Sequence, residues 1–350
     1  AGIRLACVDV DGTLTDGRLH YDADGKESKA FHVLDGQGLR LLEDHGIAVA
    51  LVTARESAAV LARARDLRIA HVHTGVKDKA ATLRMLCASL GLSAKAKISQ
   101  TELKLGTLQP KLPVIVTNDG RLLPQTFEGG TIQSKEIDNL TVNAGQLTHA
   151  MGRASSNRTG LSVAGATQDS NKFRYGGLDY KLTPDLTLQY YYSNLEDFYK
   201  QHFLGATHVF KIADDQSFKT DLRYFDSSSD GKNGNDSAYN FNNNGGYAKN
   251  TGEIDNKTWS AMFTYTLGGH ALMLGHQQVG DDGGFVWLNQ GSLSNDSGTS
   301  EGAGGSSFYL FTDSMINQFA KAGENTTFGQ YAYDFARLGV PGLKASVSYL

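Results

Sequence analysis

Two aspartates that lie two positions apart near the start of the chain could carry out phosphoryl transfer. Asp9 and Asp11 end an apolar, β-branched run at 3–10, so both side chains can point to the same side at the end of a strand. One carboxylate could attack phosphorus while the other exchanges a proton with the leaving oxygen. A divalent cation would relieve the repulsion between the two carboxylates.

Thr53 and Lys79 could complete such a centre. Thr53 ends a second apolar run at 47–53, where its hydroxyl and neighbouring amides could hold phosphate oxygens. Lys79 stands near the start of a helical pattern at 78–90 and could neutralise the nucleophile and the transferring group.

The elements that must position these residues alternate between strands and helices. Helical spacing at 36–46 and 56–68 separates apolar runs at 3–10, 47–53 and 69–73. This alternation predicts a doubly wound parallel sheet with its chemistry at the carboxyl ends of the strands.

The motif Asp9-Val-Asp-Gly-Thr13 resembles the signature of the haloacid dehalogenase (HAD) phosphatases. Further blocks narrow the resemblance to the capless 3-deoxy-D-manno-octulosonate 8-phosphate phosphatases: Asp16-Gly17, Lys29-Ala-Phe31, Asp35-Gly-Gln-Gly38 and Thr53-Ala-Arg55. The match covers residues 3–93 and implies a phosphoric monoester hydrolase that works through an aspartyl-phosphate. It also implies a homotetramer in which a hairpin within 19–31 reaches a neighbouring subunit.

The resemblance also implies roles for individual residues. The catalytic roles are nucleophile, acid/base, phosphate ligand and third-motif lysine, at Asp9, Asp11, Thr53 and Lys79. The positions implied for substrate binding are Gly12, Gly36 and Arg55. Mg²⁺ would bind Asp9 and the backbone carbonyl of Asp11.

The family's fourth motif, an acidic Gly-Asp-Asp-type turn after the lysine, is missing from residues 96–110. Gly280-Asp281-Asp282 imitates it far too late in the chain, where a solvated turn is the plainer interpretation. We therefore expect an incomplete HAD domain in which magnesium binding is weak or lost. We also expect the first strand to become an exposed apolar edge.

After about residue 96, period-two alternation replaces helical spacing. Phe218, Leu222 and Tyr224 alternate with Lys219 and Arg223, and stretches 186–192 and 259–267 alternate in the same way. An apolar face opposite a polar face fits a soluble β-sandwich or barrel as well as a membrane barrel. Short turns and long Gly/Asn/Ser stretches favour an outer-membrane barrel; the turns are at 183–185, 213–216 and 268–269, and the long stretches near 226–256 and 280–307.

Four blocks in this part resemble the OprD-type substrate-specific outer-membrane porins, at 101–110, 118–127, 195–201 and 338–343. The resemblance implies a channel in a lipid bilayer for small carboxylate-bearing or basic solutes, guided by basic side chains in the wall. Arg121 is the first pore-facing candidate, with a solvated loop arginine as the alternative, and Lys219 and Arg223 are the others. We expect a partial barrel of roughly ten strands that lacks its first and last strands and cannot close.

Composition changes at the place where the two resemblances meet. Residues 1–95 contain no Asn, no Pro and only two aromatic side chains, whereas residues 96–350 contain 18 Asn, all 5 Pro and 31 aromatic side chains. Two domains of one protein with different amino-acid compositions would produce this change, and so would two unrelated proteins joined near residue 94. We expect a fusion of a partial HAD domain at 1–94 and a partial all-β antiparallel porin barrel at 95–350, with no coherent single function. A working Mg-dependent phosphatase and a working channel remain the alternatives.

Charge and targeting signals give weaker indications. The net charge is −4, so nothing points to nucleic acid. No apolar run approaches the roughly 18 residues of a transmembrane helix. The chain starts without a signal peptide, which predicts a cytoplasmic location and conflicts with the outer-membrane destination of a porin.

Overall fold

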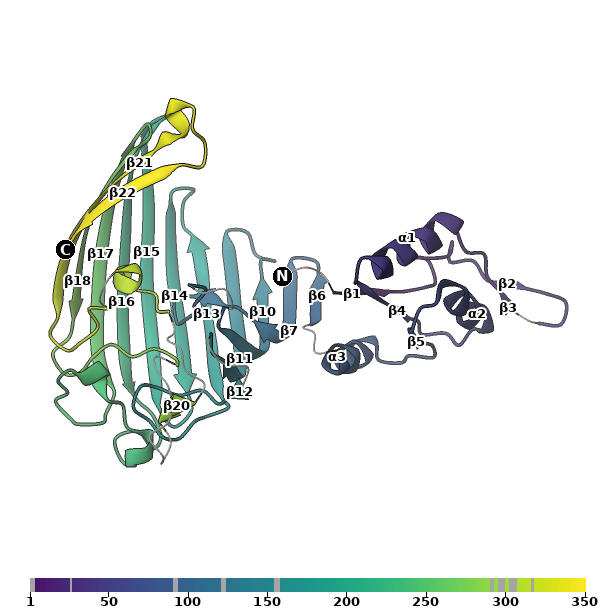
Figure 1. The fold of residues 1–350 in the computed structure, drawn as a ribbon, viewed down its shortest axis with the longest axis horizontal. Helices are drawn as coiled ribbons and strands as arrows, with labels where there is room; N and C mark the ends of the chain where they lie inside the picture. The colour runs from purple at the N-terminus through teal and green to yellow at the C-terminus, as the bar shows by residue number, and fades with distance from the viewer. Residues whose placement is uncertain are drawn as a thin grey trace. The chain divides into compact units, whose positions relative to one another are not determined.

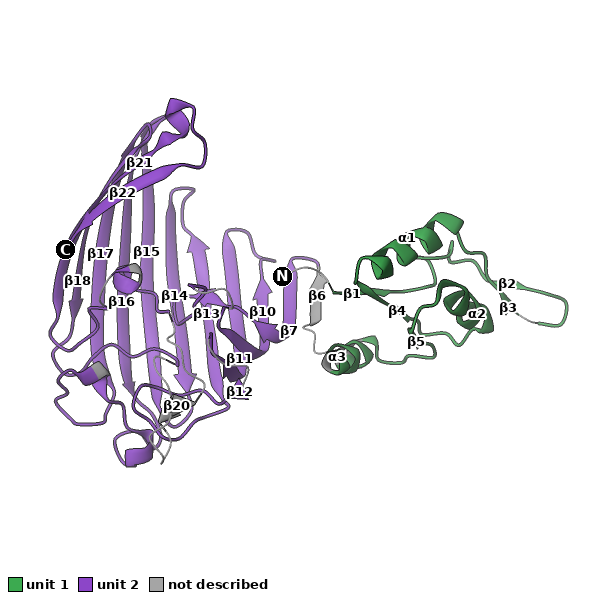
Figure 2. Cartoon of the chain, viewed as in Figure 1, with its two compact units in different colours: residues 1–94 green, residues 95–350 purple. Residues whose placement is uncertain are grey.

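The computed structural model divides the chain into two compact units, residues 1–94 and residues 95–350 (Figure 2). The described residues are 4–25, 27–90, 94–120, 124–153, 158–289, 293–294, 300–301, 307–315 and 318–350. No helix among them is both long and apolar enough to cross a membrane.

The first unit contains a parallel sheet of three strands in the order β1-β4-β5 (Figure 1). These strands are β1 (Leu5–Val8), β4 (Ala48–Val52) and β5 (His71–His73), and each lies within the apolar run that predicts it. A short hairpin joins β2 (His20–Tyr21) to β3 (Glu27–Ser28). Among the described residues β1 pairs only with β4, so β1 is an edge strand, as the sequence predicts.

Three helices cover this small sheet, at the places where helical spacing predicts them. They are α1 (Val33–Asp44), α2 (Ala58–Leu67) and α3 (Lys79–Ser89). Leu51 of β4 belongs to one apolar cluster with residues of α1 and α2, whereas Val52 belongs to another with Leu86 of α3. Successive side chains of a strand point to opposite faces, so the two clusters lie on the two faces of the sheet.

The second unit is built on one large antiparallel sheet, visible in Figure 1 as long neighbouring arrows. Thirteen strands of the described part belong to it, twelve of them along the path from β22 to β6, with β12 beside β11. In chain order they are β6 (Ala94–Ile98), β7 (Thr101–Leu108), β10 (Thr126–Ser134), β11 (Leu140–Met151), β12 (Arg158–Thr159), β13 (Phe173–Lys181), β14 (Leu186–Leu195), β15 (Tyr199–Ala213), β16 (Gln216–Ser229), β17 (Asp255–Leu267), β18 (His270–Val279), β21 (Asn325–Asp334) and β22 (Lys344–Tyr349).

The turns of this sheet lie where the sequence predicts them. Residues 214–215 join β15 to β16, and Gly268-Gly269 join β17 to β18. Beside the first turn the register of β15 and β16 shifts between Lys211 and Ala213, and it is regular from there outward, with Phe203 opposite Phe225 and Leu204 opposite Tyr224. The connections at 182–185 and 196–198 are short as well, whereas those at 230–254 and 280–324 are long. Smaller elements within the connections are the hairpins β8–β9 (Lys111–Leu112, Ile115–Val116) and β19–β20 (Leu293–Ser294, Ser300–Glu301) and four 3₁₀ turns, η1 (Ser237–Tyr239), η2 (Asn243–Gly245), η3 (Phe311–Ser314) and η4 (Phe335–Leu338).

The sheet has two different faces, which we call outer and inner. The outer face carries exposed large apolar side chains, such as Leu188, Leu204, Leu222 and Leu274. The inner face carries a mixture of buried aromatic and polar side chains, such as Tyr191, Phe203, Gln201, Asp221 and Asn256. Period-two alternation predicts this separation, and burial along β14, β16 and β17 confirms it.

The described sheet has more strands than the roughly ten that we expect from the sequence. Short strands such as β6 and β12 account for part of the difference, because a few residues do not produce a readable alternation. In the described part of the chain the path of paired strands ends at β22 and β6, which do not pair with each other.

Candidate functional site

The motif aspartates of the first unit lie just after β1, and Asp9 is paired with Lys79. The Lys79 ammonium lies 2.6 Å from Asp9 Oδ2, and both side chains are partly exposed. Lys79 is the first residue of α3, seventy positions away from Asp9 in the chain. The fold therefore brings together the pair that the sequence predicts as nucleophile and neutralising lysine.

Asp11 has a different partner, Lys29, which the sequence analysis did not single out as a site residue. The Lys29 side chain is 2% exposed and makes an ion pair with Asp11 and a second one, at 2.7 Å, with Glu27. Burial alone would lower the pKa of Lys29, but hydrogen bonds to Asp11 and Glu27 raise it above its usual value. Its position in the block Lys29-Ala-Phe31 was the available signal for this role.

The residues implied for phosphate and substrate binding, Thr53 and Arg55, differ in burial and in hydrogen-bond partners. Thr53 is buried, and its amide donates to the carbonyl of His73 at 2.9 Å. Arg55 donates to the Tyr21 hydroxyl at 3.2 Å and to Glu27 at 3.3 Å, so it is tied to the β2–β3 hairpin.

The two implied glycines differ in their surroundings. Gly12 has a φ of +78°, which favours glycine, and open space where a Cβ would lie. Gly36 is buried in α1, where a Cβ would meet Arg63 and Leu67 of α2. Absence of a Cβ therefore allows the two helices to approach each other at Gly36.

The donors that could hold the implied Mg²⁺ are few. Among the described residues no group of three or more His, Cys, Asp or Glu side chains is arranged to hold a metal ion. Asp9 and Asp11 are two carboxylates, and each is paired with a lysine. Gly280-Asp281-Asp282 follows β18 in the second unit, where Asp282 makes an ion pair with Lys249 at 3.1 Å. This ion pair supports the interpretation of the late Gly-Asp-Asp as a surface turn.

The inner face of β16 carries the charged residues that the sequence predicts for a pore. Lys219, Asp221 and Arg223 share this face, and the Asp221 carboxylate makes an ion pair with each of the two cations. Arg223 donates from Nε and one terminal nitrogen to the two carboxylate oxygens at 3.1 and 3.2 Å, and the Lys219 ammonium lies 3.4 Å away. The Lys219 side chain is 38% exposed but that of Arg223 only 12%, so the two cations differ in access to solvent.

A row of hydrogen-bonded polar side chains crosses the inner face on neighbouring strands. Asn143 of β11 donates to the Tyr191 hydroxyl on β14, which donates to Asp179 on β13, each at 2.9 Å. Gln133 and Gln189 extend the row at its two ends. A hollow of about 360 Å³ adjoins it, with polar and charged lining residues Glu102, Lys104, Lys111, Thr131, Gln133 and Asn143. The inner face thus offers both charges and amide groups to a small polar solute.

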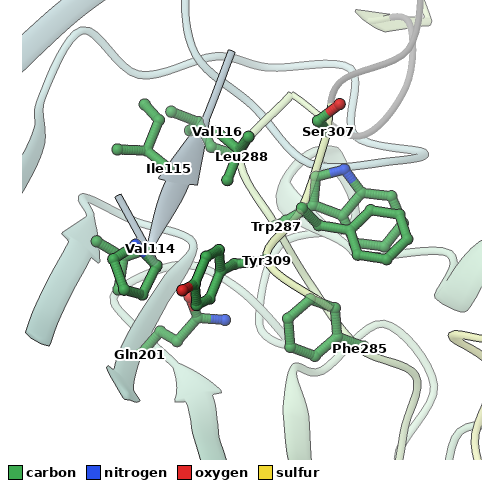
Figure 3. Close-up of a pocket in the computed structure, with 11 residues that line it drawn as sticks. Val114, Ile115, Val116, Gln201, Phe285, Trp287, Leu288, Ser307 and Tyr309 are labelled. Atoms are coloured by element: carbon green, nitrogen blue, oxygen red, sulfur yellow. The ribbon is translucent and has the colours of Figure 1, made fainter. Parts of the chain in front are cut away.

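Three connecting segments pack over the inner face near β15. Residues 113–116, 285–288 and 307–309, with Gln201 of β15, surround a cavity of about 10 Å³ (Figure 3). Trp287 and Phe308 lie with ring centres 4.5 Å apart, and Gln201 donates to the Val286 carbonyl at 3.0 Å. A cavity of this size holds about one water molecule. The connections are therefore folded against the sheet and narrow the space beside it.

The remaining pore candidate, Arg121, lies outside the described residues. Asp119 lies two positions earlier in the chain, and the ammonium of Lys111 holds the pKa of its carboxyl below its usual value, by a hydrogen bond at 2.9 Å. The sequence places Asp221 on the polar face with Lys219 and Arg223 but does not single it out as a site residue, and Tyr309 and Phe311 were missed; all three contact Arg223. Three aromatic residues directly after a Gly/Ser-rich stretch, Phe308, Tyr309 and Phe311, were the one signal for the last two.

An antiparallel sheet with an apolar outer face and a polar, charged inner face covered by long connections has the construction of an outer-membrane porin wall. Comparison with sequence families agrees, because residues 71–350 match the OprD family, described as outer membrane porins. The chain belongs to the OprD family. This match also includes residues 71–94 of the first unit.

Individual relatives give the same family. Porin D of Pseudomonas aeruginosa is 33% identical over 263 residues, which are 74% of this chain and 54% of that protein. The crystal structure of P. aeruginosa OccK8 (OprE) matches with a TM-score of 0.65 and 48% identity over 73% of this chain and 64% of that one. That of P. aeruginosa OpdQ matches with a TM-score of 0.61 and 38% identity, over 73% and 62%. The chain spans about half the length of the curated porins it matches.

A second group of relatives matches a much shorter stretch. The 3-deoxy-D-manno-octulosonate 8-phosphate phosphatase KdsC of Haemophilus influenzae is 41% identical over 93 residues, 27% of this chain and 52% of that enzyme. The comparisons thus support both resemblances and favour the porin over the phosphatase as the description of most of the chain.

Proposed function

We propose that the second unit functions as part of an outer-membrane channel for small solutes. The observation that carries this proposal is the separation of faces along strands of 9 to 15 residues from β13 to β18. About nine to eleven tilted residues suffice to cross the hydrocarbon core of a bilayer. Exposed leucines on the outer face would be costly in water and are stable in lipid. This location replaces the cytoplasmic one, which the comparisons do not support.

We expect the solutes to be small molecules that carry a carboxylate or a basic group. Lys219 is the accessible cation on the inner face of β16, and the hollow beside β7 offers Glu102 and Lys104. Charges of both signs on one wall can orient a solute that has a positive group at one end and a negative group at the other. Lys219→Gln should weaken binding of a carboxylate solute by a factor of roughly 1.4 to 5, since one exposed charge pair contributes about 0.2–1 kcal/mol.

The two tryptophans of the chain allow a direct test of which face meets lipid. Trp259 lies on the outer face of β17 and is 42% exposed, whereas Trp287 belongs to the inner cluster and is 4% exposed. Two single-tryptophan variants of the full chain would be refolded into phosphatidylcholine vesicles with and without brominated acyl chains. Trp287→Phe keeps only Trp259, and Trp259→Phe keeps only Trp287. Bromine should quench the Trp259 emission strongly and the Trp287 emission weakly.

Conduction tests the channel itself. Discrete current steps in planar bilayers, with solute block reduced in Lys219→Gln, would support the proposal. Quenching of Trp259 by aqueous acrylamide rather than by brominated lipid would overturn the membrane orientation. Absence of current steps from a chain that passes the lipid test would overturn channel function.

A second proposal concerns the first unit, and the Lys79–Asp9 pair favours it. We propose that residues 1–94 derive from a phosphatase of the HAD type and that this parent phosphatase is a homotetramer. We also propose that the chain is a fusion of this part with the porin part. Mg²⁺ would supply charge neutralisation at Asp9 and Asp11, while Lys79 would neutralise the nucleophile. We expect no turnover, because the described residues present two carboxylates and no third metal-holding group nearby.

Phosphate release from 3-deoxy-D-manno-octulosonate 8-phosphate, measured with and without Mg²⁺, tests this second proposal. The full chain and Asp9→Asn should both stay at background. Turnover that Asp9→Asn abolishes would show a working enzyme instead. Sequencing of the gene across codons 85–105 tests the fusion, because a continuous reading frame in genomic DNA would show that the join is natural.

A further inference from the structure

Arg223 is enclosed more completely than a cation that meets solutes in a channel would be. All three guanidinium nitrogens donate hydrogen bonds: two to the Asp221 carboxylate and one, at 3.2 Å, to the carbonyl of Tyr309. Two aromatic rings also cover the guanidinium, with its central carbon 3.9 Å from the ring centre of Tyr309 and 3.8 Å from that of Phe311. Such contacts are cation–π interactions, which arginine forms with its planar group.

The two rings belong to a connection, whereas Arg223 belongs to the sheet. Residues 307–315 carry Tyr309 and Phe311, and the contact with Arg223 spans 86 positions of the chain. At its start the segment forms a bridge from Ser307 to Val116. Further along, Thr312 donates to Gln277 of β18 at 3.3 Å. The central contact is therefore the arginine of β16 held between two rings of the connection.

We propose that Arg223 is a positioning residue that fastens residues 307–315 to the inner face of β16. It acts on passage by setting the width of the space beside the wall, and Lys219 is left as the cation that meets solutes. The part of this proposal that concerns passage rests on the proposed channel function. The part that concerns the segment does not, because it follows from contacts within the second unit.

Limited digestion with chymotrypsin tests the fastening, because this protease cleaves after aromatic residues. The full chain in lipid vesicles would be digested as wild type, Arg223→Gln, Arg223→Lys and the control Lys219→Gln. Lys219 lies on the same face and pairs with the same Asp221, but it lacks the two rings. Cleavage after Tyr309 and Phe311 should be at least tenfold faster in Arg223→Gln, intermediate in Arg223→Lys, and unchanged in Lys219→Gln.

Two further measurements separate local release from unfolding. Cleavage after Phe225, buried on the inner face of β16, reports loss of the whole sheet and should stay slow in every variant. If Arg223→Gln does not fold, Phe311→Leu should release the segment from the other side. Because Phe311→Leu also removes a cleavage site, these variants are compared by cleavage after Tyr309 alone. Where both fold, the double variant should be cleaved there no faster than Arg223→Gln alone. Equal cleavage of wild type and Arg223→Gln, or rate increases that multiply in the double variant, would overturn the proposal.

Current recordings give an independent signature. Arg223→Gln should change the conductance and its noise with little change in solute affinity, while Lys219→Gln should do the reverse. A channel in which Arg223→Gln lowers the affinity for a carboxylate solute as much as Lys219→Gln does would show that Arg223 binds solute directly. A silent wild type would overturn the proposed channel, and the chymotrypsin result would still decide the fastening.

Discussion

The two compact units differ in where the apolar side chains of their sheets point. In the first unit, Leu51, Val52 and their neighbours face small clusters under the helices. In the second unit, Leu204, Leu222 and Leu274 face away from the interior, while polar and aromatic side chains fill the inner face. Strands of the first unit are thus apolar on both faces, which the helices cover, whereas strands of the second unit alternate, and the medium on the outer side decides which arrangement is stable.

The largest effect that would sharpen this comparison is a cavity in the first unit. Leu51→Ala removes a fully buried side chain from β4 and should destabilise the unit by about 2–5 kcal/mol. Leu51→Met, which conserves volume, should cost less than about 1.5 kcal/mol. Hydrogen exchange of β4 amides in the full chain measures both changes. Similar protection in wild type and Leu51→Ala would show that β4 is not part of a packed core.

A charge on the outer face should have the next largest effect. Leu222→Arg places a cation where we expect lipid, which costs about 2–4 kcal/mol near the middle of a bilayer. The matched control is Leu41→Arg on an exposed position of α1, where a surface change should stay within about 0.5 kcal/mol. Urea titration of the lipid-refolded chain measures the two. Equal effects of the two variants would contradict the contrast between the units.

The smallest predicted effect is a pH dependence of the β2–β3 hairpin. Hydrogen bonds from Lys29, and then Arg55, hold the pKa of Glu27 below its usual value. The unfolded chain then binds the proton more readily, so this pairing contributes its full stability above the ordinary glutamate pKa of about 4.3 and loses it as the pH falls further. Hydrogen exchange at residues 20–28 between pH 6 and 3 should show the loss. The step should be absent from Glu27→Gln, and its persistence there would assign it to another group.

Much of the local structure could be predicted from the sequence because it depends on neighbouring residues. Alternation at 218–224 predicted the faces of β16, and the Gly-Gly pair at 268–269 predicted the turn between β17 and β18. The short strands β6 and β12 were not readable, since two to five residues carry too little pattern. Asp9 and Lys79 were predicted as a pair, and the fold brings them together.

By itself, the sequence determined the period of each element, the place of the turns and the residue types at the two sites. Tertiary structure alone decided which groups those residues meet. Lys29 bridges Asp11 and Glu27, and Arg223 lies between Tyr309 and Phe311 instead of facing an open space. The physical reason is distance along the chain: periodicity is a property of adjacent residues, whereas the partner of a charged side chain depends on how a long connection folds back over the sheet.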